Sequence, residues 1–124
     1  MLILLAALLA DGPSPEGRWT NPSGSVTIAI DSCASALCGT VVAASDKAKA
    51  DAARGGTKTL VGTQLLSGFT AAGPSKWRGR LFVPDLNKRP RATIQMLGAS
   101  QLKVTGCAVG RVACRSQVWT RAAP

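Results

Sequence analysis

Few side chains in this 124-residue chain could carry out acid–base or nucleophilic chemistry. Histidine and tyrosine are absent, which removes the commonest general acid or base and every catalytic triad that needs an imidazole. Apart from Asp11 near the N-terminus, the carboxylates are scattered, mostly in turn-forming stretches, at Glu16, Asp31, Asp46, Asp51 and Asp85. No two of them are spaced for acid–base work on one substrate. We therefore expect a protein that is not an enzyme and that uses neither a cofactor nor a metal ion.

The four cysteines form two local pairs, Cys33 with Cys38 and Cys107 with Cys114. A zinc site is the rival interpretation, but these spacings and the lack of histidine fit zinc ligation poorly. An even number of cysteines in a short chain is typical of disulfides in an exported protein. Four cysteines allow three connectivities, and we favour the two local bonds because each would bracket a turn between predicted strands. Loops this short stabilise by about 2–3 kcal/mol each through loop-closure entropy.

The first ten residues are apolar, and residues 11–16 then switch to polar, turn-forming types. A membrane-spanning helix needs about 20 apolar residues, so this run is too short to span. It resembles the apolar part of a secretory signal that is cut after Ala10, although no Lys or Arg precedes it and Leu8 occupies the −3 position. A buried first strand or helix is the alternative. We expect residues 1–10 to be a signal-peptide remnant and residues 11–124 to form one domain.

Alternation of apolar and polar residues, which is typical of half-buried strands, dominates the rest of the chain. After a first strand that opens at Gly17, strands are predicted over residues 26–31, 39–43, 60–69, 76–83, 91–97, 101–106 and 115–121. Residues 45–54 are helix formers that end at two glycines, which predicts a short helix or an ordered loop. About eight short strands with short connections favour an all-β, antiparallel up-and-down barrel. Such a barrel can hold one small ligand inside.

Turn lengths suggest how neighbouring strands pair, and a one-residue slip would invert every face. We expect apolar pairs to face inward: Leu81 with Ala92, Gly79 with Ile94, Trp77 with Met96, Met96 with Leu102, and Ile94 with Val104. The same registers place basic residues together on the outer face of three neighbouring strands: Lys76, Arg78, Arg80, Arg91 and Lys103.

The net charge of +9 and the isoelectric point near 10.3 favour anionic partners such as lipid headgroups or cell-wall polymers. The basic outer face could dock on such a surface, or it could be ordinary solvated charge on an exposed sheet. Only Phe82 interleaves with it, so the aromatic platform of a single-strand nucleic-acid binder is missing. We do not expect nucleic acid as a partner.

The second cysteine pair has consequences for the last two strands. If Cys107 lies opposite Cys114, Leu102 pairs with Trp119 and Val104 pairs with Gln117. Alternate residues of the final strand then point inward, and together with Trp77 they are our candidate ligand-binding residues: Arg115, Gln117, Trp119 and Arg121. An inward arginine or glutamine can orient a carboxylate or amide in an apolar cavity. The alternative is that Gln117 and Arg121 hydrogen-bond the barrel's own backbone.

Two segments at the ends of the chain resemble the lipocalin and calycin arrangement. Gly17-Arg18-Trp19 opens the first strand, and Trp119-Thr120-Arg121 lies on the last. The resemblance implies that Trp19 packs under Arg121 and closes one end of a barrel. The cation–π contact would then contribute about 1–2 kcal/mol if it is desolvated.

The chain also resembles a family of small exported bacterial proteins of unknown function with a lipocalin-like barrel. The stretches that carry this resemblance are Gly17-Arg18-Trp19-Thr20, Leu37-Cys38-Gly39, Leu60-Val61-Gly62, Trp77-Arg78-Gly79, Gly106-Cys107 and the run from Cys114 to Arg121. The chain departs from the family pattern in its middle loops, residues 43–59 and 84–91. The resemblance implies a fold and export to the bacterial periplasm or medium, but no ligand.

Two functions compete. The first is a monomeric barrel that binds a small apolar or amphipathic ligand, such as a fatty acid, in its interior. The second is an envelope structural or interaction protein that contacts anionic lipid or cell-wall polymer through its basic outer face. The volume and lining of the barrel interior would distinguish them most directly.

Overall fold

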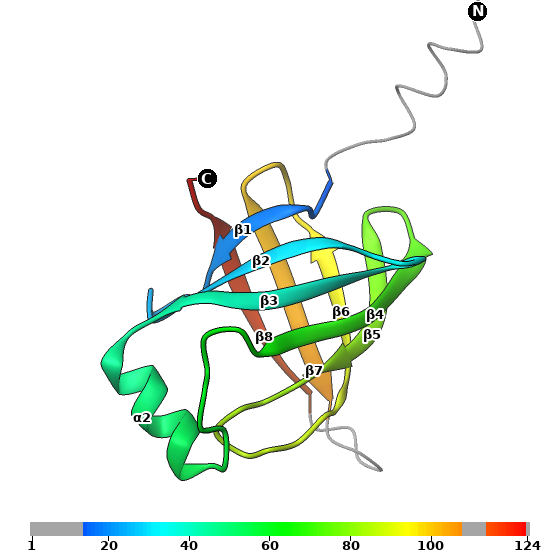
Figure 1. Cartoon of the computed structure of the whole chain (residues 1–124). Helices are drawn as coiled ribbons and strands as arrows, with labels where there is room; N and C mark the ends of the chain where they lie inside the picture. The colour runs from blue at the N-terminus through cyan, green and yellow to red at the C-terminus, as the bar shows by residue number, and fades with distance from the viewer. Residues whose placement is uncertain (1–13, 108–113, 124) are drawn as a thin grey trace, which may run out of the picture.

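The computed structural model describes residues 14–107 and 114–123, and within them eight strands close into one antiparallel barrel in chain order (Figure 1). The strands are β1 (Gly17–Thr20), β2 (Val26–Cys33), β3 (Ala36–Ala44), β4 (Gln64–Gly73), β5 (Lys76–Leu81), β6 (Arg91–Met96), β7 (Gln101–Cys107) and β8 (Cys114–Arg121). Closure comes from the pairing of β1 with β8, where Trp19 lies opposite Arg121. The predicted all-β barrel is therefore confirmed. The apolar run 1–10 and the expected cut after Ala10 lie outside the described residues.

A helix, α2 (Asp46–Arg54), connects β3 to β4, so the segment predicted as a helix or ordered loop is a helix. Ser45 is its N-cap: its side chain accepts a hydrogen bond from the backbone nitrogen of Ala48 at 3.1 Å. Gly55 ends the helix, and the buried Ala52 attaches it to the barrel. No helix in the described part of the chain is long and apolar enough to cross a membrane.

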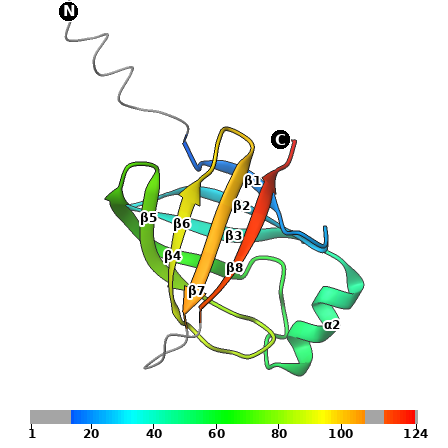
Figure 2. The ribbon, with the colours of Figure 1, turned by 180° about the vertical axis from the view of Figure 1, so that it is seen from behind.

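The up-and-down order places successive connections at opposite ends of the barrel (Figures 1 and 2). We call one end the helix end; it carries residues 21–25, α2 with the segment that follows it, and the β5–β6 connection at residues 82–90. The other, the hairpin end, carries the tight β2–β3, β4–β5 and β6–β7 turns, together with Glu16 and Ala122. The two ends therefore differ in construction, with long connections at one and tight hairpins at the other.

Inward-facing apolar residues fill the hairpin half of the barrel. The most deeply buried side chains are Trp19, Ile28, Ile30, Val41, Phe69, Ile94 and Leu102. They alternate with more exposed residues along each strand because successive side chains of a strand point to opposite faces. The expected pairs of Met96 with Leu102 and of Ile94 with Val104 are present, as is the predicted register of β7 on β8.

The predicted pairing of β5 with β6 is wrong by two residues. Trp77 lies opposite Ile94, and Gly79 lies opposite Ala92. The reason is a tighter turn than expected: the nitrogen of Val83 donates to the oxygen of Lys88 at 2.8 Å, and Asn87 adopts a left-handed φ of 52°. A shift of two residues keeps the side chains of β5 and β6 on their predicted faces. Phe82, which the sequence places on the basic outer face, is instead buried, because β5 ends at Leu81 and the alternation does not continue past it.

Two element boundaries also differ from the prediction. Residues 60–63 form a turn, with Gly62 at a φ of 96°, so β4 begins at Gln64 and continues to Gly73. The β2–β3 turn is only Ala34 and Ser35, so both strands extend past the expected hairpin tip.

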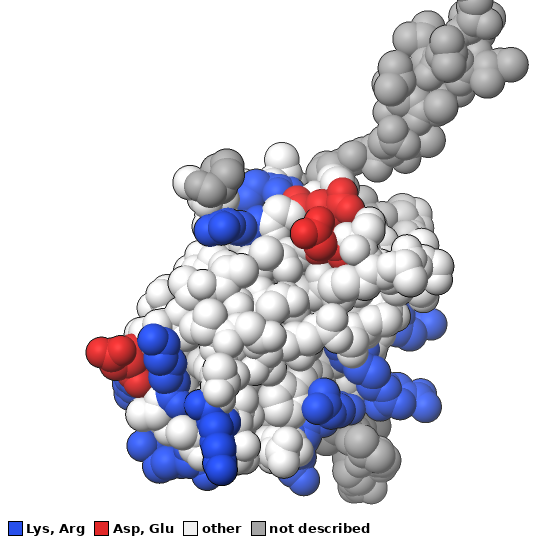
Figure 3. All heavy atoms as spheres, viewed as in Figure 1, with Lys and Arg blue, Asp and Glu red and all other residues white. Residues whose placement is uncertain are grey.

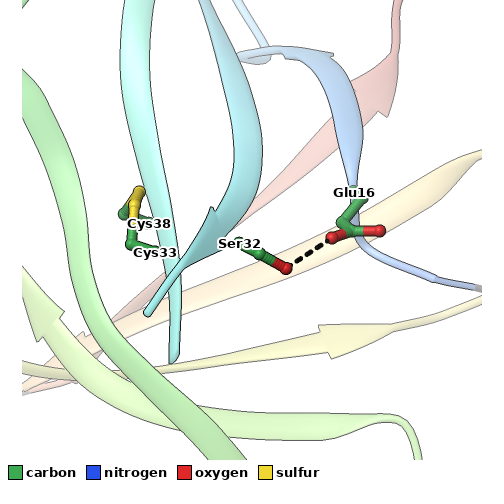
Figure 4. Close-up of a disulfide and its surroundings, with 4 residues drawn as sticks. All are labelled: Glu16, Ser32, Cys33 and Cys38. Atoms are coloured by element: carbon green, nitrogen blue, oxygen red, sulfur yellow. Dashed lines mark hydrogen bonds between the residues drawn. A yellow bond between two sulfur atoms is a disulfide. The ribbon is translucent and has the colours of Figure 1, made fainter. Parts of the chain in front are cut away.

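Both predicted disulfides are present. Cys107 lies directly opposite Cys114, whereas Cys33 and Cys38 join β2 and β3 diagonally, because Cys38 lies opposite Asp31. Figure 4 shows the Cys33–Cys38 bond beside Ser32, whose hydroxyl donates to a carboxylate oxygen of Glu16 at 2.9 Å. The hairpin is thus linked covalently within itself and by a hydrogen bond to the segment that precedes β1.

Candidate functional site

A large cavity opens at the helix end of the barrel. Its volume is about 1240 Å³, above the range of about 300–1,000 Å³ that is typical of small-ligand pockets. Its walls are nearly buried apolar side chains from five different segments: Leu60, Leu65, Phe82, Val104 and Trp119. The interior is therefore filled at the hairpin end and hollow at the helix end.

Strand β8 supplies one wall of this cavity. Arg115, Gln117 and Trp119 alternate along it and all three line the cavity, as the sequence predicts for inward positions. The indole Nε1 of Trp119 donates to the side-chain oxygen of Gln117 at 3.1 Å. This bond orients the Gln117 amide so that its nitrogen, a donor, is left for another acceptor. From the interior toward the mouth, this wall therefore presents the indole of Trp119, the amide of Gln117 and the guanidinium of Arg115.

The mouth of the cavity is basic. Lys47 from α2, Lys88 and Arg89 from the β5–β6 connection, and Arg115 from β8 all line it. The Arg89 guanidinium lies 4.4 Å from the centre of the Phe82 ring, which holds a cation against the apolar wall. Within the described ranges, ion pairs are confined to α2.

The carboxylate of Asp51 is the acidic group of α2 at this mouth, and it is already engaged. Lys47 donates to it at 2.9 Å, and Arg54 pairs with its other oxygen. The hydrogen bond from Lys47, together with the charges of Lys47 and Arg54, holds the pKa of Asp51 below its usual value. Asp85, in the β5–β6 turn, also lines the mouth. The charge presented to a ligand there is therefore mainly positive.

Contacts between α2 and the β5–β6 connection set the shape of the mouth. A Cβ added to Gly55 would lie 2.0 Å from the backbone oxygen of Asp85, so the end of the helix touches the turn backbone directly. The hydroxyl of Thr57 donates to the oxygen of Pro84 at 3.1 Å. Both contacts join residues about thirty positions apart, and no local sequence pattern indicates them.

Two of the five candidate ligand-binding residues lie away from this cavity. Arg121 is at the hairpin end, where its guanidinium stacks 4.3 Å from the Trp19 ring centre, as the resemblance to lipocalins implies. It also donates to three backbone oxygens, those of Ala99, Glu16 and Ser14. The alternative that Arg121 bonds the barrel's own backbone is thus the one observed.

Trp77 is half-buried at the hairpin half of the barrel, in a small hollow of about 320 Å³ shared with Leu37 and Phe69. The cavity therefore unites Arg115, Gln117 and Trp119 and leaves Trp77 and Arg121 outside. It adds residues that sequence reasoning missed: Lys47, Leu60, Leu65, Phe82, Lys88 and Arg89. The adjacent Lys88 and Arg89 were the available sequence signal for a basic mouth. Loop residues have no periodicity, however, so the sequence does not indicate which way their side chains point.

The predicted basic outer face lies on β5, β6 and β7, on the wall seen in Figure 2. Arg78, Arg80, Arg91 and Lys103 are exposed there and Lys76 is half-buried. Arg80 lies directly opposite Arg91, an unfavourable pairing of like charges. The wall formed by β2, β3 and β4, by contrast, is nearly free of charge (Figure 3).

With the barrel and its cavity defined, comparison with known proteins assigns the chain to a family. The family described as uncharacterized proteins conserved in bacteria (DUF2147) matches residues 17–121, from the first residue of β1 to the last of β8. The chain belongs to this family. No functionally curated protein matches it.

A solved structure has the same fold as this DUF2147 protein. It is a protein from the human pathogen Helicobacter pylori that belongs to the lipocalin family. The two superpose with a TM-score of 0.69 at 10% sequence identity, over 90% of this chain and 84% of the other. At this identity the likeness establishes a lipocalin-like fold and carries no ligand across.

Proposed function

We propose that this DUF2147 protein binds one amphipathic molecule with an apolar tail and an anionic head, of the fatty-acid type, inside its barrel. The observation that carries the proposal is the cavity of about 1240 Å³ with apolar walls and a basic mouth. Tail contacts would come from Leu65, Phe82, Val104 and Trp119, and burial of each methylene group contributes about 0.8 kcal/mol.

Arg115 and Gln117 would receive the head. They follow Trp119 outward along β8, so a tail that packs on the indole leads its carboxylate toward an amide and a guanidinium. Charge-assisted hydrogen bonds to a carboxylate contribute about 1.5–3 kcal/mol, with the lower value expected at a solvated mouth.

We propose binding rather than catalysis as the activity. The Asp51 carboxylate at the mouth is paired with Lys47 and Arg54, and its lowered pKa makes it a weaker base and leaves it without a proton to donate. We also propose that the protein is exported, because two disulfides persist best in an oxidising compartment.

Displacement of a fluorescent fatty acid, combined with native mass spectrometry of gently extracted protein, tests the proposal. Val104→Trp fills the cavity from β7 and should weaken binding at least tenfold. Val118→Trp is the matched control, because Val118 lies on the outer face of β8 and is 38% exposed. Arg115→Gln should weaken binding of a fatty acid about tenfold but barely affect the corresponding alcohol. Equal affinity of Val104→Trp and Val118→Trp would refute the proposal.

The alternative function is contact with an anionic envelope surface, lipid or cell-wall polymer, through the basic outer face. The specific observation in its favour is the Arg80–Arg91 pairing, because like charges placed opposite each other cost stability. If this face makes the contact, Arg78→Gln with Lys103→Gln should lower binding to anionic vesicles.

A further inference from the structure

The β5–β6 connection holds the most exposed large apolar side chain of the described residues. Leu86 is 63% exposed, whereas Leu60, Leu65, Leu66 and Leu102 are buried. It lies in the turn between Val83 and Lys88, where its own nitrogen donates to the oxygen of Val83 at 3.2 Å. The turn is braced by the contact of Gly55 with Asp85 and by the Thr57–Pro84 hydrogen bond. Leu86 is thus presented to solvent by an ordered turn.

Cations surround this leucine. Lys88 and Arg89 lie two and three positions after it in the chain and are exposed, and Lys47 and Arg115 line the same cavity mouth. Figure 3 shows Lys and Arg gathered at the lower end of the molecule, where α2 lies in Figure 1. Lys47, Arg54 and Asp51 together carry one net positive charge, so among the acidic residues lining the mouth Asp85 is the one that opposes the cations.

An exposed apolar side chain that shares a cavity mouth with several cations matches the chemistry of one surface in particular. An anionic phospholipid bilayer offers phosphates to the cations and, just beneath them, an apolar layer to the leucine. A polyanion such as a cell-wall polymer or nucleic acid would satisfy the cations but offers no place for an aliphatic side chain. We propose that the helix end of the barrel docks on an anionic phospholipid bilayer, with Leu86 entering the interface and Lys88 and Arg89 contacting headgroup phosphates.

Docking in this orientation places the cavity mouth against the lipid. This docking is independent of the proposed ligand, because Leu86, Lys88 and Arg89 would contact the bilayer whether the cavity is filled or empty. The hairpin end, with Arg121 held by three backbone oxygens, faces away from the bilayer.

Partition onto vesicles of phosphatidylcholine mixed with phosphatidylglycerol, measured by co-sedimentation at physiological salt, tests the proposal. Each cation near an anionic surface contributes about a fivefold gain in partition, so Lys88→Gln with Arg89→Gln should lower it about 25-fold. The matched control is Arg78→Gln with Lys103→Gln, which removes the same net charge from the outer wall. At this ionic strength, salt screens the attraction between charges that are more than about 8 Å apart. Charges on the outer wall, away from the docked end, should therefore affect partition little.

The apolar contact is tested separately. Leu86→Ser should lower partition roughly tenfold, whereas Leu97→Ser should not. Leu97 is the matched control because it is 49% exposed but lies in the β6–β7 turn at the hairpin end. As a second measurement, Leu86→Trp should be quenched by brominated phosphatidylglycerol and Leu97→Trp should not. Pure phosphatidylcholine vesicles should bind weakly throughout.

Three results would overturn docking by the helix end. The first is an equal loss of vesicle partition in the Lys88→Gln, Arg89→Gln variant and in the Arg78→Gln, Lys103→Gln variant. The second is an unchanged partition of Leu86→Ser, and the third is equal quenching of the tryptophans introduced at positions 86 and 97. Val104→Trp separates this proposal from the ligand proposal, because it should weaken fatty-acid binding at least tenfold and leave vesicle partition intact. Fatty-acid binding without vesicle partition would refute docking alone.

Discussion

Arg121 is expected to be the main polar contributor to the closed hairpin end, and its replacement by methionine gives a quantitative test. The side chain donates to the oxygens of Ala99, Glu16 and Ser14 at 2.7, 2.9 and 2.8 Å and stacks on the fully buried Trp19. Arg121→Met keeps the length of the side chain and removes all four interactions.

The expected loss follows from the geometry. Charge-assisted hydrogen bonds contribute about 1.5–3 kcal/mol when buried, but water can replace half-buried Arg121 at the carbonyls, so we take about 0.5–1 kcal/mol each. The cation–π contact adds about 1 kcal/mol. The total is roughly 3 kcal/mol, which corresponds to a fall in Tm of about 10 °C or more for a domain of this size. Arg18→Met, at an exposed position beside Trp19, should stay within about 0.5 kcal/mol of the parent protein.

Gly17 makes the test more specific. A Cβ at this position would lie 2.6 Å from Nη1 of Arg121, and the backbone φ is +126°. Gly17→Ala should therefore destabilise twice over, through backbone strain of about 1–3 kcal/mol and through displacement of the guanidinium. In the Arg121→Met background only the strain remains, so the double variant should be more stable than the sum of single effects by about 1 kcal/mol.

Thermal and denaturant unfolding followed by circular dichroism would measure the stability of the parent protein and the four variants. A loss below about 0.5 kcal/mol for Arg121→Met, or strict additivity with Gly17→Ala, would refute the assigned role of Arg121.

Two further predictions concern the barrel wall and the helix. Gly79→Ala should destabilise the protein by about 1–3 kcal/mol, because its Cβ would lie 2.7 Å from both Cδ1 of Phe69 and the oxygen of Ser67. Gly98→Ala is the control and should leave stability unchanged, because no atom lies within 4 Å of its added Cβ. Equal denaturation midpoints of the two variants would contradict the prediction. The lowered pKa of Asp51 means that its pairing stabilises α2 above the ordinary aspartate pKa and is lost as pH falls through the lowered value. Lys47→Gln should raise that pKa in a carbon-13 NMR titration, and an unchanged titration would exclude Lys47 as the cause.

Local patterns predicted the barrel and most of its pairing. Tight hairpins and a period of two leave few registers that bury Ile94, Val104 and Leu102 together, and Cys107 opposite Cys114 fixes β7 against β8. The β5–β6 register failed because its turn depends on the left-handed φ of Asn87, which composition indicates poorly. The inward positions on β8 were predictable because the side chains of a strand alternate.

The sequence by itself determined a barrel with alternating faces and two local cysteine pairs, and its resemblance to lipocalins implied the stacking of Arg121 on Trp19. Only the tertiary structure decided that the cavity opens at the helix end, and that Lys88, Arg89 and Leu86 surround its mouth. The physical reason is that the mouth is built from connections without periodicity. Their paths are set by long-range contacts, such as Gly55 against Asp85, that form only once the barrel has closed.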